Sequence, residues 1–133
     1  MLGRLNHVAI AVTDLKSATN TYRDILGAKV GEPLDQPEHG VTVVFIELPN
    51  TKIELITPLG ENSPIFNFLN KNKNGGIHHI CYEVKNLELS INILMKNNYK
   101  IIGDNPKIGA HGKPVIFLHP SGFDGTLIEL QEE

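Results

Sequence analysis

The sequence contains a single cysteine, Cys81, so the chain has no second thiol with which to form an internal disulfide. It also lacks a run of apolar residues long enough to cross a bilayer. The opening residues, MLGRLNHVAIAV, lack the basic and long apolar regions of a secretory signal. An unpaired cysteine in a chain without an export signal is typical of a reducing compartment, so we expect a cytoplasmic protein.

Excess charge of either sign is also missing. The 133 residues carry 12 basic and 15 acidic side chains, for a formal net charge of -3. Such a balance produces no field that would draw the chain onto nucleic acid or an anionic membrane, so we expect neither as a partner. A hydrophobic content of 41% and a charged content of 20% are ordinary for a globular protein, and the length fits one domain spanning residues 1–133.

The strongest organising feature is an internal repeat. The segment HVAIAV, His7 to Val12, runs through three residues into an amphipathic segment, and HICYEV, His79 to Val84, does the same. Three extended segments follow each helix, at about 28–32, 41–48 and 51–57 and then at about 99–104, 114–118 and 126–131. The order βαβββ, twice, predicts an α+β fold of two modules, about 1–60 and about 77–133, joined by a connector at about 61–76. Pro49-Asn50 predicts a hairpin between the last two strands of the first module.

Both predicted helices have capping residues and an apolar stripe that should pack on a sheet. In the first helix, Thr13 or Asp14 can cap the start and Gly27 can end it in a left-handed conformation. In the second, Asn86 is the expected cap and the Asn97-Asn98 pair suits termination. The expected stripes are Leu15, Ala18, Tyr22, Ile25 and Leu26 in the first helix, and Leu87, Ile91, Leu94 and Met95 in the second. Within the connector, Ser63-Pro64 predicts a further helix start.

Strand alternation places a histidine on the same face of the first strand in each module. His7 shares its face with Ala9 and Ala11, and His79 shares its face with Cys81 and Glu83. A histidine at the start of a strand is more often structural than a metal ligand. Its recurrence at matching positions in both modules favours a functional role.

Each module also ends in a strand with a glutamate between apolar residues. These are Glu54 in KIELI and Glu129 in TLIEL. If the modules are related by a pseudo-twofold axis, both histidines and both glutamates approach that axis. Two imidazoles and two carboxylates suit a divalent ion such as Zn, Ni, Co, Mn or Fe, with positions left for water or substrate.

Several longer motifs cover nearly the whole chain. They are LNHVAIAVTDL (Leu5 to Leu15), PEHGVTVVFIEL (Pro37 to Leu48), NTKIELITPLG (Asn50 to Gly60), NKNKNGGIHHICYEV (Asn70 to Val84) and KIGAHGKPVIFLHP (Lys107 to Pro120). With these motifs the sequence resembles the vicinal oxygen chelate superfamily, also called the glyoxalase/bleomycin resistance/dioxygenase superfamily. Within it, the sequence is most similar to the methylmalonyl-CoA epimerase family.

The resemblance implies a cup-shaped mixed sheet, built from two βαβββ modules, around one divalent ion of Co, Ni, Zn or Mn. The ligands fall on His7, Glu54, His79 and Glu129. It also implies a homodimer and an isomerase that acts on an acyl-CoA thioester, removing and returning a proton beside a carbonyl through a chelated enediolate. We interpret Glu129 and Glu54 as the catalytic pair, one on each face of the substrate carbon.

Two alternatives remain open. The glyoxalase I (lactoylglutathione lyase) family shares the two-His, two-Glu ligand set and acts on the hemithioacetal of methylglyoxal and glutathione. Its glutathione-binding arginine and asparagine are replaced here by Ala11 and Pro58. The superfamily also includes non-catalytic binding proteins, in which we would expect ligands to be lost. Against the epimerases, some members carry an additional catalytic glutamate where this chain has Val43.

The remaining histidines are interpreted more simply. His78 alternates away from His79 and is expected to pack or to form hydrogen bonds, and His119 is expected to be structural. His39 and His111 lie in glycine-containing loops that suit either mobile lids or plain solvent exposure. Cys81 is interpreted as a small buried residue. Lys113 is a weak candidate for contact with an acyl-CoA phosphate.

Overall fold

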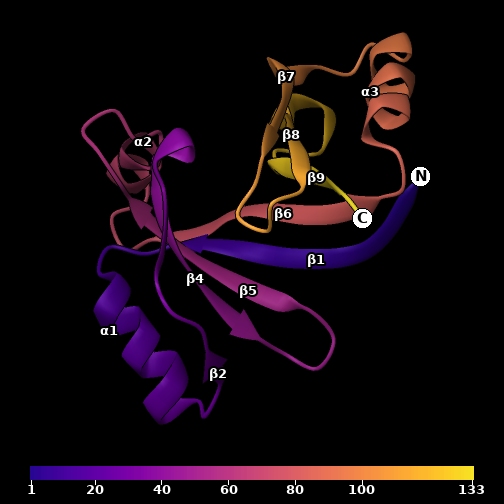
Figure 1. The fold of residues 1–133 in the computed structure, drawn as a ribbon. Coiled ribbons are helices and arrows are strands. Elements are labelled where there is room, and N and C mark those ends of the chain that lie inside the picture. Colours follow the sequence, from indigo (N-terminus) through magenta and orange to yellow (C-terminus); the bar gives the residue numbers. More distant parts are fainter. The chain divides into compact units, whose positions relative to one another are not determined.

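The computed structural model describes all residues of the chain, Met1–Glu133, as an α+β fold with nine strands and three α-helices (Figure 1). In chain order the elements are β1 (Leu2–Ala11), α1 (Leu15–Asn20), a π-helical turn (Thr21–Ile25), β2 (Lys29–Val30), β3 (Leu34–Gln36), a 3-10 turn (Pro37–His39), β4 (Val41–Glu47), β5 (Lys52–Pro58), α2 (Ile65–Lys71), β6 (Gly76–Val84), α3 (Leu87–Lys96), β7 (Ile101–Ile108), β8 (Pro114–Leu118), a 3-10 turn (Pro120–Gly122) and β9 (Ile128–Glu132). The predicted βαβββ order is confirmed in both modules, and the short strand β3 is an addition that the sequence pattern did not predict.

The chain forms two compact units. Unit 1 contains Met1–His7 and His79–Glu133, and unit 2 contains Val8–His78. The boundaries fall inside β1 and inside β6, so the units do not coincide with the two sequence modules. The first residues of β1 belong with the strands of the second module.

Unit 2 contains a strand order of β2-β4-β5-β1, with β3 paired to β4. The hairpin predicted at Pro49-Asn50 is confirmed, because β4 and β5 pair antiparallel and the Leu48 N–H donates to the Thr51 carbonyl at 2.9 Å. The core of unit 2 is formed by Val44, Ile46 and Leu55. The residues that pack against this core are Ile10, Val12, Leu15, Ala18, Tyr22, Ala28, Val30 and Ile53. This is the predicted arrangement, in which the first helix covers one face of the sheet.

The first helix ends differently from the prediction. Asp14 caps its start as expected, since its carboxylate accepts from the Ser17 N–H at 3.0 Å, and Gly27 follows its end with φ of 67°. The final turn, however, is π-helical, with the Leu26 N–H donating to the Thr21 carbonyl at 3.0 Å. An i to i+5 turn holds one more residue than an α-helical turn and rotates the residues after it. Ile25 and Leu26 are therefore 79% and 64% exposed, and their assignment to the buried stripe was wrong.

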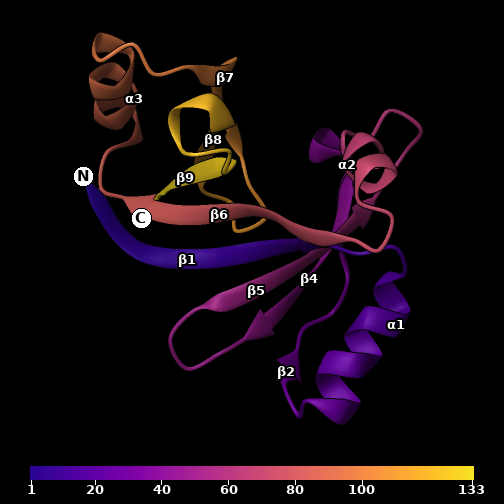
Figure 2. The same ribbon diagram turned by 180° about the vertical axis from the view of Figure 1, so that it is seen from behind.

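Unit 1 contains a strand order of β1-β6-β9-β8-β7. Strands β6 and β9 run parallel, and β8 runs antiparallel to β9. Figure 2, seen from behind, shows both chain ends in this unit, near each other. The core consists of Val84, Leu87, Leu94, Ile116, Leu118, Ile128 and Leu130. Leu87 and Leu94 place one face of α3 on the sheet, as predicted.

The caps of α3 are confirmed and one stripe residue is not. The Asn86 side chain accepts from the Leu89 N–H at 2.8 Å, and Asn98 takes a left-handed φ of 64° just after the helix. Met95 is 60% exposed, whereas Ser90 is buried. Met95 follows Leu94 by one residue, and this step of about 100° turns its side chain away from the core.

The connector in unit 2 has the predicted helix and a structural histidine. The Ser63 hydroxyl accepts from the Ile65 N–H at 3.3 Å, so α2 begins one residue later than the Ser63-Pro64 pair suggests. The His78 ring packs edge-on against Phe68, with ring centroids 5.0 Å apart. The packing interpretation of His78 is confirmed.

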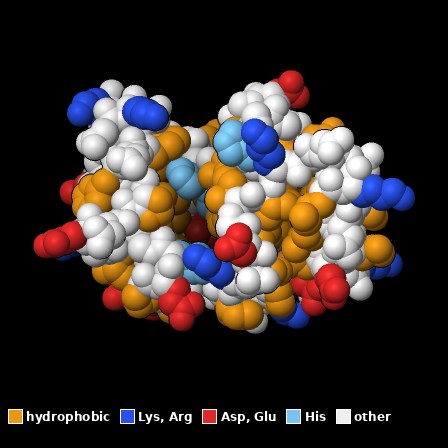
Figure 3. Space-filling model, turned by 90° about the horizontal axis from the view of Figure 1, so that it is seen from above, with side chains coloured by type: hydrophobic (Ala, Val, Ile, Leu, Met, Phe, Trp, Pro, Cys, Tyr) orange, Lys and Arg blue, Asp and Glu red, His pale blue; other side chains and the backbone are white.

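None of the helices combines the length and apolar character needed to cross a membrane. On the face drawn in Figure 3, basic and acidic side chains are interspersed among apolar ones rather than gathered by sign.

We predict that Gly75→Ala destabilises the fold more than Gly60→Ala. Both glycines have left-handed φ values, 80° and 82°, which cost an L residue roughly 1–2 kcal/mol. Only at Gly75 would an added Cβ clash with backbone, at the Ala11 carbonyl oxygen, whereas nothing lies within 4 Å of a Cβ added at Gly60. Urea unfolding should show a free-energy loss for Gly75→Ala at least about twice that of Gly60→Ala. Equal losses would show that the chain around Ala11 yields without cost.

Candidate metal centre

Three neighbouring strands of unit 1 bring His7, His79 and Glu129 together. His7 lies on β1, His79 on β6 and Glu129 on β9, and the parallel β6–β9 register sets Cys81 directly opposite Glu129. His79 precedes Cys81 by two residues and shares its face of β6. All three side chains are buried, with exposures of 2%, 5% and 6%. The structure brings these three predicted residues together, and their role as metal ligands stays a prediction.

The atoms that meet are all potential metal ligands. The Nε2 atoms of His7 and His79 lie 3.2 Å and 2.9 Å from Glu129 Oε2, and they lie 3.3 Å from each other. Ligand atoms about 2.1 Å from a zinc-like ion are separated by about 3.0–3.4 Å in octahedral or tetrahedral geometry. The triangle therefore has nearly the dimensions of one face of a metal coordination shell.

The protons available in this cluster also fit a cation. His7 Nδ1 lies 2.7 Å from the Asn6 side-chain oxygen, which is an acceptor, so Nδ1 carries the proton. In neutral His7 the Nε2 atom then carries a lone pair. This atom faces His79 Nε2 and Glu129 Oε2. A divalent ion among these atoms would relieve the repulsion between their lone pairs. Without the ion, protons on the Nε2 atoms take its place and donate hydrogen bonds to Glu129.

The Glu129 carboxyl group is held in its ionised form. Burial by itself raises its pKa, but hydrogen bonds from His7 and His79, together with the charge of the two rings, outweigh burial and hold the pKa well below its ordinary value. Glu129 is therefore an anion across the neutral range, which is the form that binds a metal or accepts a proton.

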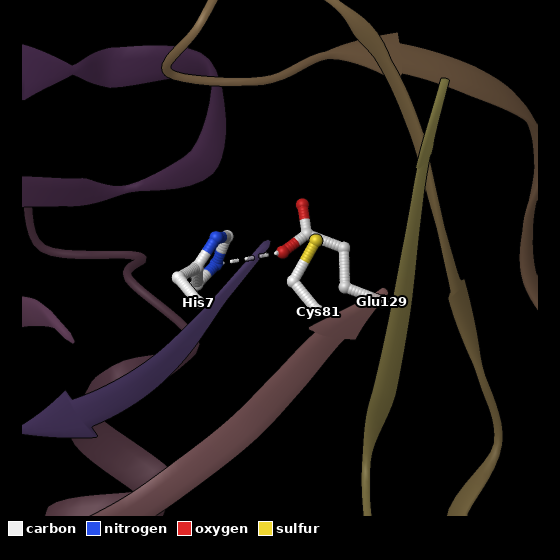
Figure 4. A group of neighbouring side chains, drawn as sticks. All are labelled: His7, Cys81 and Glu129. Atoms are coloured by element: carbon white, nitrogen blue, oxygen red, sulfur yellow. Dashed lines mark ion pairs between the residues drawn. The ribbon is translucent and has the colours of Figure 1, made fainter. Parts of the chain in front are cut away.

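Two further side chains border this cluster. Cys81 is fully buried, and its sulfur lies within 4.8 Å of ligand atoms of His7 and Glu129 (Figure 4). The ring of Phe117 meets the His79 ring edge-on, with centroids 5.2 Å apart, and so restricts its rotation. The interpretation of Cys81 as a small buried residue is confirmed. Its closeness to the cluster and the contacts of Asn6 and Phe117 were not predicted, because they depend on strand register.

Glu54 lies on β5, in unit 2, opposite Phe45 of β4. It is 7% exposed, and its neighbours Ile53 and Leu55 pack in the core of that unit. The predicted alternation of side chains along β5, with Glu54 between two apolar residues that pack in the core, is confirmed. The assignment of Glu54 as a metal ligand stays a prediction.

The other residues singled out from the sequence have ordinary contacts. The His119 side chain accepts from the Ser121 N–H at 3.1 Å and caps the 3-10 turn Pro120–Gly122, which confirms its structural role. Lys113 Nζ donates to the Glu133 backbone oxygen at 3.0 Å. His39 ends the 3-10 turn Pro37–His39, and Val43 is buried in β4.

Comparison with known proteins places this chain in a family. Residues 6–117 match the model of the Glyoxalase/Bleomycin resistance protein/Dioxygenase superfamily. An ethylmalonyl-CoA/methylmalonyl-CoA epimerase of Cereibacter sphaeroides is 61% identical, over 99% of this chain and 99% of the relative. The mitochondrial methylmalonyl-CoA epimerase of Bos taurus is 57% identical, over 98% of this chain and 75% of its own length.

Solved structures agree. The methylmalonyl-CoA epimerase of Mycobacterium tuberculosis, at 30% identity, superposes with a TM-score of 0.91 and covers 98% of this chain and 88% of its own. That of Streptomyces coelicolor, in complex with 2-nitronate-propionyl-CoA, has a TM-score of 0.93 at 27% identity and covers 100% of this chain and 99% of its own. The sequence, the fold and the His/Glu cluster lead to one conclusion: the chain belongs to the Glyoxalase/Bleomycin resistance protein/Dioxygenase superfamily.

Proposed function

We propose that this chain is a metal-dependent isomerase that epimerises methylmalonyl-CoA. The observation that carries the proposal is the 61% identity to the Cereibacter sphaeroides epimerase, which extends over 99% of both chains. That relative is also named for ethylmalonyl-CoA, so a short 2-alkylmalonyl thioester of CoA is the substrate class. A methylmalonyl-CoA epimerase of the same fold has been solved in complex with methylmalonyl-CoA.

The metal site consists of His7, His79 and Glu129, with Glu54 as the proposed fourth ligand. The donor set and the separations of 2.9–3.3 Å among the first three support a divalent ion of the Co, Ni, Zn or Mn type. Such an ion supplies a Lewis acid that stabilises negative charge on the substrate oxygens as the proton leaves the neighbouring carbon.

Glu129 is the first proton-transferring group. Its Oε2 faces the two histidines, and Figure 4 shows its second carboxylate oxygen directed away from His7. The lowered pKa keeps this carboxylate ionised, which is the form that can accept the proton from the second carbon of the substrate, but it also makes the carboxylate a weaker base.

Inversion at that carbon needs a second group on the opposite face, because a single base returns the proton to the side from which it came. We assign this role to Glu54. Its support is its position in β5, which corresponds in the repeat to that of Glu129 in β9, and its burial at 7% exposure. One carboxylate removes a proton, and the other delivers one to the opposite face.

The glyoxalase I and binding-protein alternatives have less support. The ligand residues expected to be lost in a binding protein are all present, and Ala11 and Pro58 replace the glutathione-binding residues of glyoxalase I. The relatives at 54–61% identity carry epimerase names. They include bacterial and mitochondrial proteins, so the cytoplasmic location remains a prediction, as does the homodimer.

We expect the metal-loaded protein in deuterium oxide to exchange the proton on the second carbon of methylmalonyl-CoA and to interconvert the two epimers. Removal of the ion by a chelator should abolish both activities, and cobalt, nickel or zinc should restore them. The hemithioacetal of methylglyoxal and glutathione, assayed beside it, should give no lactoylglutathione. Absence of exchange in protein shown to contain metal would eliminate the epimerase proposal.

We also expect Glu129→Gln and Glu54→Gln to differ in stereochemistry. Each should slow epimerisation by about 10²–10⁴-fold, because an amide cannot transfer the proton. Each should leave deuterium exchange largely intact for only one epimer, and the retained epimer should differ between the two variants. Glu47→Gln, on the exposed end of β4, is the matched control and should behave as the unaltered protein. If both variants lose exchange with the same epimer, the two glutamates do not act on opposite faces.

Metal affinity should fall as the solution is made more acidic. Protons compete with the ion for the Nε2 lone pairs of His7 and His79, so binding must release protons. Glu129 contributes little to this dependence near neutral pH, because its lowered pKa keeps it ionised there. Calorimetric titrations of zinc in buffers of different ionisation enthalpy will count the protons released. An affinity that does not change with pH would show that the imidazoles are not ligands.

A further inference from the structure

A chain of hydrogen bonds in unit 1 runs from the surface to His7. The Arg4 guanidinium donates to both oxygens of Glu83, at 3.1 Å and 3.2 Å, and the Asn6 amide nitrogen donates to Glu83 Oε1 at 2.9 Å. The Asn6 oxygen lies 2.7 Å from His7 Nδ1. Burial increases along the chain, from 76% and 12% side-chain exposure at Arg4 and Glu83 to residue exposures of 4% at Asn6 and 2% at His7.

Only one arrangement of protons satisfies this chain. An ionised carboxylate accepts hydrogen bonds and donates none, so the amide nitrogen of Asn6 must face Glu83. The Asn6 oxygen then faces His7, and His7 Nδ1 must carry the hydrogen. The lone pair of neutral His7 consequently lies on Nε2, the atom 3.2 Å from Glu129. A rotated Asn6 would set its oxygen against the Glu83 carboxylate.

We propose that Asn6 and Glu83 are positioning residues, which hold His7 in the Nδ1–H form so that Nε2 is presented to the metal. Arg4 contributes by holding the Glu83 carboxylate in place. The inference rests on the metal site of the proposed function. Partners of this kind fix the tautomer and ring orientation of metal-ligating histidines and strengthen their binding.

The sequence repeat shows that this support is specific to one histidine. Glu83 follows His79 by four residues, and the residue four after His7 is Ala11, which has no carboxylate. The residue before His79 is His78, which packs on Phe68, whereas the residue before His7 is Asn6. The two modules repeat the ligands but not this chain of hydrogen bonds, so its loss should affect His7 alone.

Four variants test this inference: Asn6→Ala, Asn6→Asp, Glu83→Gln and the double variant Asn6→Asp/Glu83→Gln. Glu88→Gln, exposed in the first turn of α3, is the matched control. Zinc and cobalt affinities are measured by competition with a chelator, the His7 tautomer by 15N NMR of the metal-free protein, and stability by thermal unfolding of the same sample.

We expect Asn6→Ala to weaken zinc binding by roughly 10–100-fold and to remove the preference for Nδ1–H. Glu83→Gln should do the same to a smaller degree, because an amide can face Asn6 in either orientation. Asn6→Asp keeps an acceptor for His7 but sets two carboxylates together, so it should lower the unfolding temperature while retaining affinity. The double variant should restore the unfolding temperature lost in Asn6→Asp and the zinc affinity lost in Glu83→Gln, since the amide introduced at position 83 can donate to the carboxylate introduced at position 6.

A positioning role predicts that zinc affinity and unfolding temperature change independently among the variants. A merely structural role predicts that they change together. The inference is overturned if Glu83→Gln binds zinc like the control, or if affinity in all four variants simply follows the unfolding temperature. Should Asn6→Ala not fold, Glu83→Gln and the double variant still decide the matter. A failure of the unaltered protein to bind metal would instead reject the proposed function.

Discussion

The site in unit 1 depends on three atoms that meet at a shared point: His7 Nε2, His79 Nε2 and Glu129 Oε2, all within 3.3 Å of one another. Lone pairs at such distances repel, and burial removes the water that would otherwise separate them. A buried polar group without a partner costs about 1–3 kcal/mol, so the arrangement is tolerable only with protons or a cation among the three atoms. The parallel register of β6 with β9 brings Glu129 to the two histidine rings' side of the sheet. It sets Glu129 opposite Cys81, and His79 lies two residues before Cys81 on the same face of β6.

The parts of this site that were predictable from sequence are those set by local periodicity. Alternation along a strand determines that His79 and Cys81 share a face, and a repeat of the same pattern identifies His7 as the equivalent of His79. Asn86 and Asp14 were recognisable as caps because the hydrogen bond they make spans only three residues. The parts that escaped depend on pairing between distant strands: Phe117 meets His79, and Asn6 meets Glu83, only once β1, β6, β9 and β8 are in register. The exposure of Ile25 and Leu26 follows from a single π turn, which no hydrophobic pattern reveals.

The two modules share the positions of the proposed ligands, but the surroundings of these positions differ. His7 and His79 begin matching motifs, yet His7 is oriented by Asn6, Glu83 and Arg4, and His79 packs against Phe117. The Phe117 edge restricts rotation of the His79 ring, whereas the Asn6 oxygen both orients the His7 ring and selects its tautomer. The contacts that surround the two imidazoles therefore differ although the sequence motifs match. The repeat predicts where ligands lie and does not predict how each is supported.

A shared metal centre does not by itself decide between an isomerase and a lyase of this superfamily. Both reactions begin with removal of a proton beside a carbonyl, and in both a cation offsets the charge that develops on oxygen. They differ in where the proton returns. A lyase can move it between adjacent carbons with one carboxylate, whereas inversion at one carbon requires groups on both faces. An ionised Glu129 would therefore suit either reaction, and in the proposed mechanism the second carboxylate decides the outcome. For this chain the question of function reduces to the chemical role of Glu54, a carboxylate that is 7% exposed and stands between Ile53 and Leu55 in β5.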